Sequence, residues 1–416
     1  MAALEISKAT RRIASTYPSL VLFQLARFFL VLATEMQAVA VGWQVYEITK
    51  RPLDLGLVGL AQFLPGIFLF LVSGHAADRY PRRNLLVLCY CGFTLCSGSL
   101  LFLTLRGLHS VYPIFAVTVL LGVVRSFNGP VSRAFLPQLV SGKDFQTAVA
   151  WYSIFIQSAV ILGPSLGGLV YAAFRGPAAV YTLSFIAAAL GAMSTVAIKA
   201  QSNPRPGEPM SWKTMLAGFH YIRRERLILG SISLDLFAVL LGGAVALLPV
   251  YAREILKTGP WGLGILRSAP AAGAATMAAL IAHKPLGQRT GSTMLWCVAG
   301  FGAATIVFGL SRSLTISLIA LLLVGATDMV SVIVRQLFIQ VSTPDEMRGR
   351  VNAVDMIFVG ASNELGQFES GLTAHWFGIV PAVVLGGLGT LAVTALWAWY
   401  FPELRKTEEK VDSSAP

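Results

Sequence analysis

Residues 74–83 read Gly-His-Ala-Ala-Asp-Arg-Tyr-Pro-Arg-Arg, a short charged stretch between two long apolar runs at 55–76 and 84–105. An α-helix needs ~20 residues to cross the hydrocarbon core of a bilayer, and each run is long enough. The stretch therefore predicts two membrane-spanning helices joined by a tight basic loop, and the pattern found here recurs along the chain.

Apolar runs separated by short polar connections extend over nearly the whole sequence. We expect twelve spans, at 20–43, 55–76, 84–105, 111–130, 146–173, 177–199, 228–250, 259–283, 292–310, 314–340, 350–376 and 380–401. The ends of four of these spans are less sharply defined, because charged residues lie near them: Arg133, Arg335, Asp355 and Glu364. The predicted fold class is an all-α membrane protein.

The composition excludes a soluble protein. The 416 residues are 55% hydrophobic and only 12% charged, whereas soluble domains carry about 25% charged residues. The net charge of +12 could indicate nucleic-acid binding. However, the basic residues lie between apolar runs, with neither zinc-ligand spacing nor a basic–aromatic repeat, so no nucleic-acid partner is expected.

Basic residues concentrate in alternate loops, beginning with the N-terminal one. Cytoplasmic loops are the ones enriched in Lys and Arg. An even number of spans then places both termini in the cytoplasm, and we expect a multi-pass protein of the bacterial cytoplasmic membrane.

A Pro-rich segment divides the chain near its middle. Pro204, Pro206 and Pro209 precede a stretch of mixed basic and apolar residues that predicts an amphipathic helix on the membrane surface. The expected organisation is an N-terminal six-helix bundle at 1–199, a cytoplasmic linker at 200–227, a C-terminal six-helix bundle at 228–401 and a disordered tail at 402–416.

The two halves also resemble each other. Arg133 and Gln138 recur at the same spacing as Arg335 and Gln340, about half the chain later. Two six-helix halves related by a parallel repeat are typical of major facilitator transporters.

The loop at 74–83 resembles the signature loop of that superfamily, Gly-x-x-x-Asp-Arg-x-Gly-Arg-Arg, with Pro81 in place of the second glycine. The resemblance implies a conformational latch that stabilises the outward-open state. The residues that would form this latch are Gly74, Asp78, Arg79, Arg82 and Arg83. The alternative is that the basic cluster only fixes the topology of the chain.

Two further motifs resemble those of drug–proton antiporters. Arg125 and Gly129 in span 4 match Arg-x-x-x-Gly, which implies a role for Arg125 in proton coupling; a structural ion pair or a position near the interface remains an alternative. In span 5, residues 163–168 match Gly-Pro-x-x-Gly-Gly, with Gly163, Pro164, Gly167 and Gly168 at the motif positions. Small-residue helix packing alone could also produce that string.

The loop Thr343-Pro344-Asp345-Glu346-Met347-Arg348-Gly349-Arg350 is similar to the loop between spans 10 and 11 in the branch of drug–proton antiporters that holds the enterobactin exporter and the Tap-type multidrug pumps. The likeness extends over essentially the whole chain. One departure is that residues 283–291 lack an Asp-Arg pair, so a second latch there is not expected.

Ionisable residues inside spans are candidates for function because lipid does not solvate them. A proton-coupled transporter needs a carboxylate that takes up a proton, and we single out Glu35 and Asp235, in the first spans of the two halves, together with Arg125. The further candidates for the cavity lining are Arg27, Gln37, Asp328, Arg335 and Glu364. Asp355 is expected near the interface, paired with Arg348 or Arg350.

The sequence therefore predicts an exporter of bulky amphipathic molecules, drugs or siderophores, driven by the proton gradient and working by alternating access. An importer or lipid flippase on the same fold remains open.

An enzyme is disfavoured because the histidines are scattered along the chain: His75, His109, His220, His283 and His375. We expect neither a cofactor nor a metal. The expected partners are membrane lipid, protons and a small molecule, and the protein is expected to be a monomer.

Overall fold

The computed structural model describes residues 15–199, 212–284 and 289–406, and every regular element in these ranges is helical. Eleven of the described helices are both long and apolar enough to cross a membrane. The predicted span at 350–376 corresponds to α14 (Asp345–Phe377), whose 33 residues reach ~50 Å. This helix is long enough to span but is more polar than the others, and one of its charged residues, Asp355, is part of the site described below.

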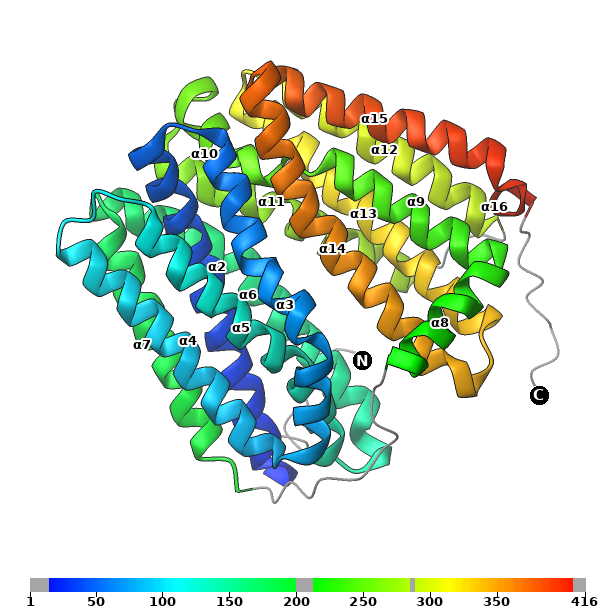
Figure 1. The fold of residues 1–416 in the computed structure, drawn as a ribbon, viewed down its shortest axis with the longest axis horizontal. Helices are drawn as coiled ribbons and strands as arrows, with labels where there is room; N and C mark the ends of the chain where they lie inside the picture. The colour runs from blue at the N-terminus through cyan, green and yellow to red at the C-terminus, as the bar shows by residue number, and fades with distance from the viewer. Residues whose placement is uncertain (1–14, 200–211, 285–288, 407–416) are drawn as a thin grey trace. The chain divides into compact units, whose positions relative to one another are not determined.

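Within each half of the chain the helices follow one another with short connections (Figure 1). Those of the N-terminal half are α2 (Pro18–Thr49), α3 (Pro52–Arg79), α4 (Arg82–Leu105), α5 (Tyr112–Phe135), η1 (Leu136–Gln138), η2 (Gly142–Asp144), α6 (Phe145–Ala173) and α7 (Pro177–Val196). Those of the C-terminal half are α8 (Trp212–Arg224), α9 (Arg226–Gly242), η3 (Ala244–Leu247), α10 (Leu248–Val250), the π-helical turn η4 (Tyr251–Ile255), α11 (Gly259–His283), α12 (Thr290–Leu310), α13 (Leu314–Ser342), α14, α15 (Ile379–Tyr400) and α16 (Pro402–Lys406).

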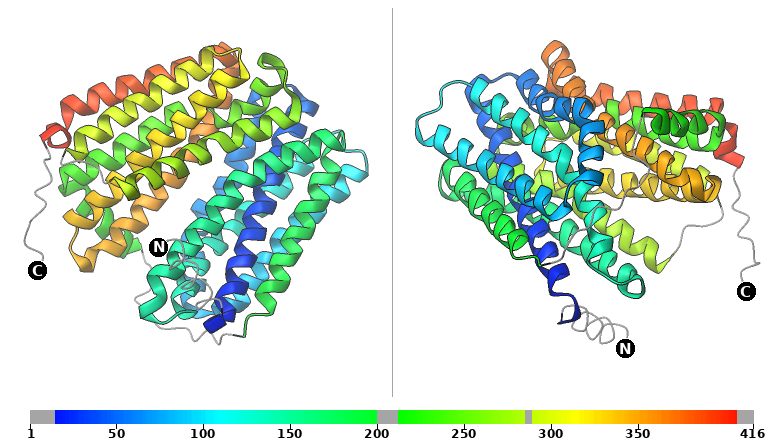
Figure 2. Two further views of the ribbon diagram at one scale, coloured as in Figure 1. Left: turned by 180° about the vertical axis from the view of Figure 1, so that it is seen from behind. Right: turned by 60° about the horizontal axis from the view of Figure 1, so that its bottom comes forward.

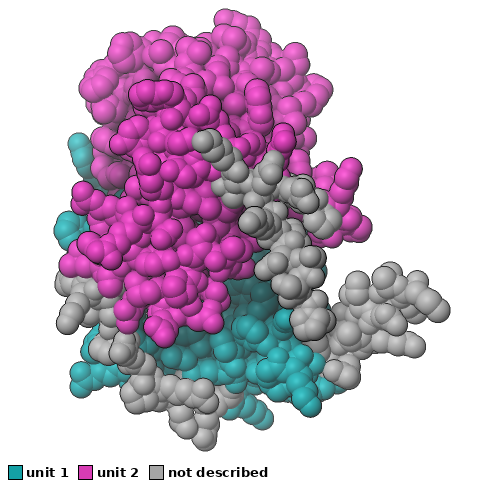
Figure 3. All heavy atoms as spheres, turned by 90° about the vertical axis from the view of Figure 1, so that its right-hand side faces the viewer, with its two compact units in different colours: residues 1–44, 61–210 teal, residues 45–60, 211–416 magenta. Residues whose placement is uncertain are grey.

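Contacts divide the chain into two compact units, coloured separately in Figure 3. The first contains residues 1–44 and 61–210, and within it α4 packs against both α5 and α7. The second contains residues 211–416 together with 45–60. The division after residue 210 lies within the linker that the sequence predicts, but the assignment of 45–60 to the second unit was not expected. In that unit Gly56 closely approaches the backbone of Gln367 on α14.

The second unit is organised around two apolar clusters. One joins α9, α12, α13 and α16 through residues that include Leu234, Met294, Val334 and Leu404. The residues of α16 therefore form a helix with a buried leucine, although the sequence predicts a disordered tail from residue 402; residues 407–416 lie outside the described part of the chain.

The second cluster explains the position of the amphipathic helix α8. Ile222 of α8 is buried against residues of α9, α13 and α14, and Tyr221 donates a hydrogen bond of 2.6 Å to the carbonyl oxygen of Ser342. Burial, and to a smaller extent the charge of Glu225, raises the pKa of the Tyr221 hydroxyl. The hydroxyl therefore keeps the hydrogen that it donates in this bond. Leu216 and Phe219 remain exposed. The helix is thus fixed to the second unit by one face, while the rest of the predicted linker, residues 200–211, lies outside the described residues.

Helices α11 and α13 run side by side in the second unit (Figures 1 and 2) and meet without intervening side chains at two glycines. A Cβ atom at Gly325 of α13 would overlap the carbonyl oxygen of Pro270, and one at Gly273 of α11 would overlap that of Leu322. Both obstacles are backbone atoms, so neither can rotate away. The close approach of these two helices therefore depends on the two glycines.

We expect Gly325→Ala to lower the stability of the protein by about 1–3 kcal/mol, because the helices must separate to admit the methyl group. The measurement is thermal unfolding of the protein purified in detergent. Gly349→Ala in α14 is the control, since nothing lies within 4 Å of the added Cβ there. An unchanged melting temperature for Gly325→Ala would show that the helices are not in close contact.

Candidate functional site

A cluster of buried ionisable side chains lies in the second unit, where α9, α13 and α14 each contribute one member of an ion-pair network. Asp235 comes from α9, Arg335 from α13 and Asp355 from α14. Their exposed fractions are 6%, 2% and 2%. Ionisable groups this far from water are costly unless they are paired, so the arrangement of partners around them decides what the cluster can do.

Arg335 lies between the two carboxylates. Its Nη1 forms an ion pair with Oδ2 of Asp235, and its Nε lies 3.0 Å from Oδ1 of Asp355. The remaining carboxylate oxygens have neutral donors: the Ser331 hydroxyl donates to Oδ1 of Asp235 at 3.1 Å, and the Gln336 amide donates to Oδ2 of Asp355 at 3.0 Å. One guanidinium thus connects three helices.

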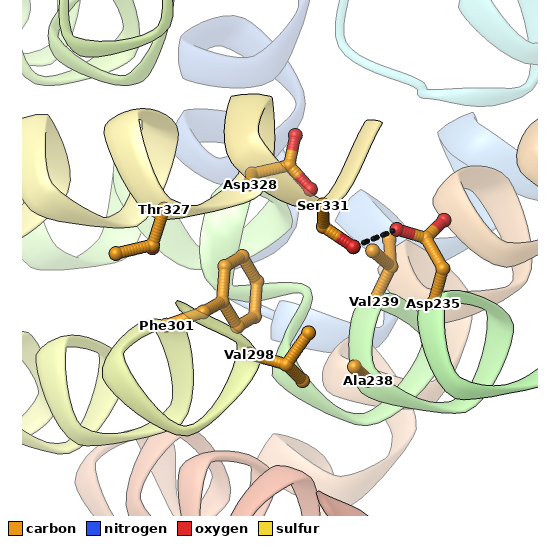
Figure 4. A pocket seen from close by; sticks show the side chains of 8 residues that line it. All are labelled: Asp235, Ala238, Val239, Val298, Phe301, Thr327, Asp328 and Ser331. Carbon is orange, nitrogen blue, oxygen red and sulfur yellow. Dashed lines mark hydrogen bonds between the residues drawn. The ribbon is translucent and has the colours of Figure 1, made fainter. Parts of the chain in front are cut away.

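A third carboxylate, Asp328, lies next to this ion-pair cluster. Asp328 and Asp235 line the same small cavity, of about 10 Å³, together with Ser331 and Phe301 (Figure 4). That volume is close to the space occupied by one water molecule. Asp328 is within electrostatic range of Asp235 and Arg335, yet it has no hydrogen bond or ion pair to any residue that the structure describes. The site therefore contains three carboxylates and one guanidinium.

The sequence singled out Asp235, Asp328 and Arg335 individually but did not predict that they would meet. The prediction for Asp355 was wrong: it is buried and pairs with Arg335, not with Arg348 or Arg350 near the interface. Arg348 instead lies 2.7 Å from Asp345, one turn away. The spacing of Asp328, Ser331 and Arg335 on α13, at i, i+3 and i+7, was the signal that could have identified a shared helix face.

The candidates of the first unit are distributed over α2 and its neighbours. Gln37 is buried and accepts a hydrogen bond of 2.7 Å from the Ser97 hydroxyl. Arg125 is exposed on α5 and donates to the Gln62 side chain at 3.1 Å. Arg27 lies over the ring of Tyr152, with 4.6 Å between the guanidinium carbon and the ring centroid. Glu364, in the second unit, accepts a bond from Gln367 within α14; none of these four residues belongs to the ion-pair cluster.

Glu35 lies where the predicted antiporter motif of α6 meets α2. Gly163, Pro164, Gly167 and Gly168 are all buried. A Cβ at Gly163 would lie 2.6 Å from the Cβ of Glu35, and one at Gly167 would lie 2.9 Å from the Cα of Met36. The motif thus allows α6 to pack tightly against the helix that carries Glu35. Its role in antiport, like that of Glu35 itself, stays a prediction.

The predicted latch spans the end of α3 and the start of α4. Arg82 donates to the carbonyl oxygens of Ala77 at 3.2 Å and Ala134 at 2.9 Å, and Arg83 donates to that of Val196. These arginines connect α3, α4, α5 and α7. Gly74 is buried and Arg79 is exposed, whereas Asp78 has no ion pair or hydrogen bond with any described residue. The expected latch contact of Asp78 is therefore not formed in this structure.

Across the described residues, no group of three or more His, Cys, Asp or Glu side chains is arranged to hold a metal ion. Arg335 occupies the space between two of the three carboxylates of the cluster, where it provides the positive charge itself. The chemistry available to this site is the uptake and release of a proton by a carboxylate close to a fixed cation.

We expect Arg335→Leu to destabilise the protein by about 3–5 kcal/mol, because Asp235 and Asp355 would be left buried without a counter-charge. A triple substitution, D235L/R335L/D355L, should recover much of that loss. Arg226→Leu is the control, because Arg226 forms an exposed ion pair with Glu403, and such pairs contribute about 0–1 kcal/mol. Urea or thermal unfolding in detergent measures all three; equal effects of Arg335→Leu and Arg226→Leu would contradict the buried network.

Known proteins resemble this chain over almost its whole length. Residues 21–416 match the family described as transmembrane secretion effector. The chain is 26% identical over 399 residues to the enterobactin exporter EntS of Shigella boydii serotype 4 and to that of Escherichia coli O1:K1, covering 94% of this chain and 94% of each relative.

Solved structures share the fold at low sequence identity. A bacterial homologue of the human lysosomal transporter Spinster has a TM-score of 0.71 at 12% identity, covering 94% of this chain and 98% of that one. A peptide transporter of the POT family in complex with sulfate has a TM-score of 0.70 at 12% identity, covering 94% and 96%. The chain therefore belongs to the transmembrane secretion effector family and is a multi-pass membrane transporter of small molecules with the major facilitator fold.

Proposed function

We propose that this protein exports bulky amphipathic molecules, of the siderophore or drug type, across the bacterial cytoplasmic membrane in exchange for protons, by alternating access and with both termini in the cytoplasm. The observation that carries the proton coupling is the ion-pair cluster of the second unit with the adjacent Asp328. The cargo class is supported by the relatives named enterobactin exporter, and the direction by the description of the family as a secretion effector.

The charge balance of the cluster favours a bound proton. With every group ionised, Asp235, Asp328 and Asp355 would carry three negative charges against the single positive charge of Arg335. An uncompensated charge in a low-dielectric interior costs several kcal/mol, and a carboxylate that binds a proton avoids this cost. Proton binding is therefore the simplest way to bring the cluster closer to neutrality.

Asp328 is the carboxylate best suited to take up that proton. Asp235 and Asp355 each hold an ion pair with Arg335 and accept a neutral hydrogen bond, and these interactions favour their charged forms. Asp328 has neither kind of interaction within the described part of the chain. It also lines the small cavity, so there is space beside it for a single water molecule that could carry the proton.

The state of Asp328 would alter how the three helices are held together. When Asp328 is protonated, Arg335 is shared by two carboxylates, one on α9 and one on α14. When Asp328 loses its proton, a third negative charge competes for the same guanidinium and weakens its hold on the other two. A change of one proton thus biases the packing of α9 and α14 against α13, which is the kind of two-state element that coupling requires.

Transport into inside-out vesicles tests this proposal, with the vesicle interior made acidic by respiration and a panel of lipophilic drugs and iron-free siderophores offered outside. We expect accumulation that a protonophore abolishes. Asp328→Asn should reduce accumulation at least ~10-fold, because the amide cannot release a proton. Glu403→Gln is the control, since Glu403 forms an exposed ion pair with Arg226 and lies outside the ion-pair cluster.

Either of two results would overturn proton-driven export. The first is accumulation that a protonophore does not affect, which would leave a facilitator on the same fold. The second is uptake seen only in right-side-out vesicles, which would indicate an importer. Wild-type accumulation by Asp328→Asn would retain an exporter but remove the proposed proton carrier.

A further inference from the structure

We propose that Arg27 and Tyr152, in the first unit, form a binding subsite for an aromatic organic anion, and that this group is part of the transported molecule. That this group belongs to the transported molecule rests on the proposed function, whereas the subsite itself follows from the contacts of the first unit. It identifies a chemical feature of the cargo, namely a negative charge carried on or beside an aromatic ring.

Arg27 lies on α2 and forms no ion pair with any described residue. The Nε of Arg27 is buried and has no hydrogen-bond partner, and no carboxylate of the described residues forms an ion pair with this side chain. Its contacts are with aromatic rings: the guanidinium carbon lies 4.6 Å from the ring centroid of Tyr152 and 5.9 Å from that of Phe23. Aromatic faces attract a cation but do not neutralise its charge.

A lone arginine within a membrane span costs roughly 2.5–3.5 kcal/mol on insertion scales, and residues of this kind mark substrate pathways by default. The positive potential around Arg27 is increased by its surroundings, because Arg133 on α5 is within electrostatic range of both Arg27 and Tyr152. Two guanidinium groups within electrostatic range of one phenol ring create a positive potential there. An anion that enters this position would satisfy the free donors of Arg27 with charge-assisted hydrogen bonds.

Tyr152 supplies a second polar contact. Its hydroxyl is half-buried on α6 and has no hydrogen-bond partner within the described ranges. One turn earlier on the same helix, the carbonyl oxygen of Ala148 accepts a bond of 3.2 Å from Gln24 of α2, which fixes the two helices next to each other at this level. The Tyr152 hydroxyl and the Arg27 guanidinium are thus held on facing helices, both with unused donors.

Aromatic side chains continue from this position along α2 and α6. Phe155 of α6 lies 6.1 Å from Phe28 of α2 and 6.4 Å from Trp151, measured between ring centroids. All three rings are half-exposed. A planar aromatic group can stack or make edge contacts on such a row, whereas a compact inorganic anion cannot use it. The combination of free cationic donors and adjacent rings therefore favours an aromatic anion.

The subsite is placed where an exporter would load its cargo. Arg27 lies nine residues after the first residue of α2, which is ~14 Å along the helix, and Arg133 and Ala148 lie near the connected ends of α5 and α6. In the topology proposed above, all of these are in the cytoplasmic half of the span. Arg27 and Tyr152 are each partly exposed, so the proposed subsite is not closed off from solvent.

Equilibrium binding to the detergent-purified full-length protein tests the proposal with three probes. These are radiolabelled 2-naphthoate (an aromatic anion), unlabelled 2-naphthamide (aromatic but neutral) and unlabelled cyclohexanecarboxylate (anionic but not aromatic). We expect saturable naphthoate binding that neither competitor displaces at the concentration at which unlabelled naphthoate does. Arg27→Gln should weaken it at least ~10-fold.

Two further variants separate a binding role from a structural one. Arg106→Gln is the matched control, because Arg106 also lies over a ring, 4.9 Å from that of Phe102, but outside the proposed subsite; its naphthoate affinity should equal that of the wild type. Arg27→Lys keeps the charge and should bind naphthoate more weakly than the wild type while still rejecting naphthamide. This variant retains the test if Arg27→Gln does not fold.

The subsite would be contradicted by equal competition from naphthamide and naphthoate, by the absence of saturable naphthoate binding to the wild type, or by unchanged affinity in the folded Arg27 variants. Because binding is measured without a gradient, these results do not depend on proton coupling. Binding as described, combined with failure of the vesicle experiment, would retain the subsite and reject only its role in proton-driven export.

Discussion

Arg335 is held between Asp235 and Asp355 inside the membrane-spanning part of the second unit, and the packing of that unit depends on this interaction. The guanidinium joins α13 to α9 on one side and to α14 on the other. It also explains why α14 can be long and polar and yet lie within the bundle, since its Asp355 is neutralised there. Removing the cation would leave two buried carboxylates, which is far less favourable than an apolar replacement of all three residues.

Each unit contains an ionisable side chain that has no ion pair with a described residue, and the proposed function uses both side chains. Next to the ion-pair cluster, the second unit has a carboxylate that forms no ion pair with a described residue, Asp328. On α2, the first unit has a guanidinium that no described carboxylate neutralises, Arg27. An excess of carboxylate favours the uptake of a proton, and an excess of cation favours the uptake of an anion. The two ligands of an antiporter would then have separate binding positions, each on a rigid helical frame.

The fold could largely be predicted from the sequence, because the signals for a spanning helix are local. Run length, loop charge and the loop at 74–83 together indicated the major facilitator fold, and this was confirmed. A span was predicted at 350–376 from the length of its run, and the more polar helix α14 covers these residues. The grouping of residues 45–60 with the second unit was not foreseen, since nothing local in this segment indicates which helices it packs against.

The site was less predictable, because its residues come together only in three dimensions. Asp235, Asp328 and Arg335 were recognised one by one as ionisable groups inside spans. Asp355 was assigned to nearby arginines in sequence, whereas its partner lies on the preceding helix, and spacing within one helix carries no information about a neighbour. The unpaired state of Arg27 was equally invisible, because the absence of a counter-charge can be established only when the surrounding helices are known.

Infrared difference spectroscopy tests most directly whether the ion-pair cluster with Asp328 holds an exchangeable proton. A pH titration of the purified protein would follow the carbonyl stretch of a buried protonated carboxylic acid. We expect such a band in the wild type, its loss as the pH is raised, and its absence from Asp328→Asn. If no band appears, or if an identical band persists in Asp328→Asn, the cluster does not carry the proton as described.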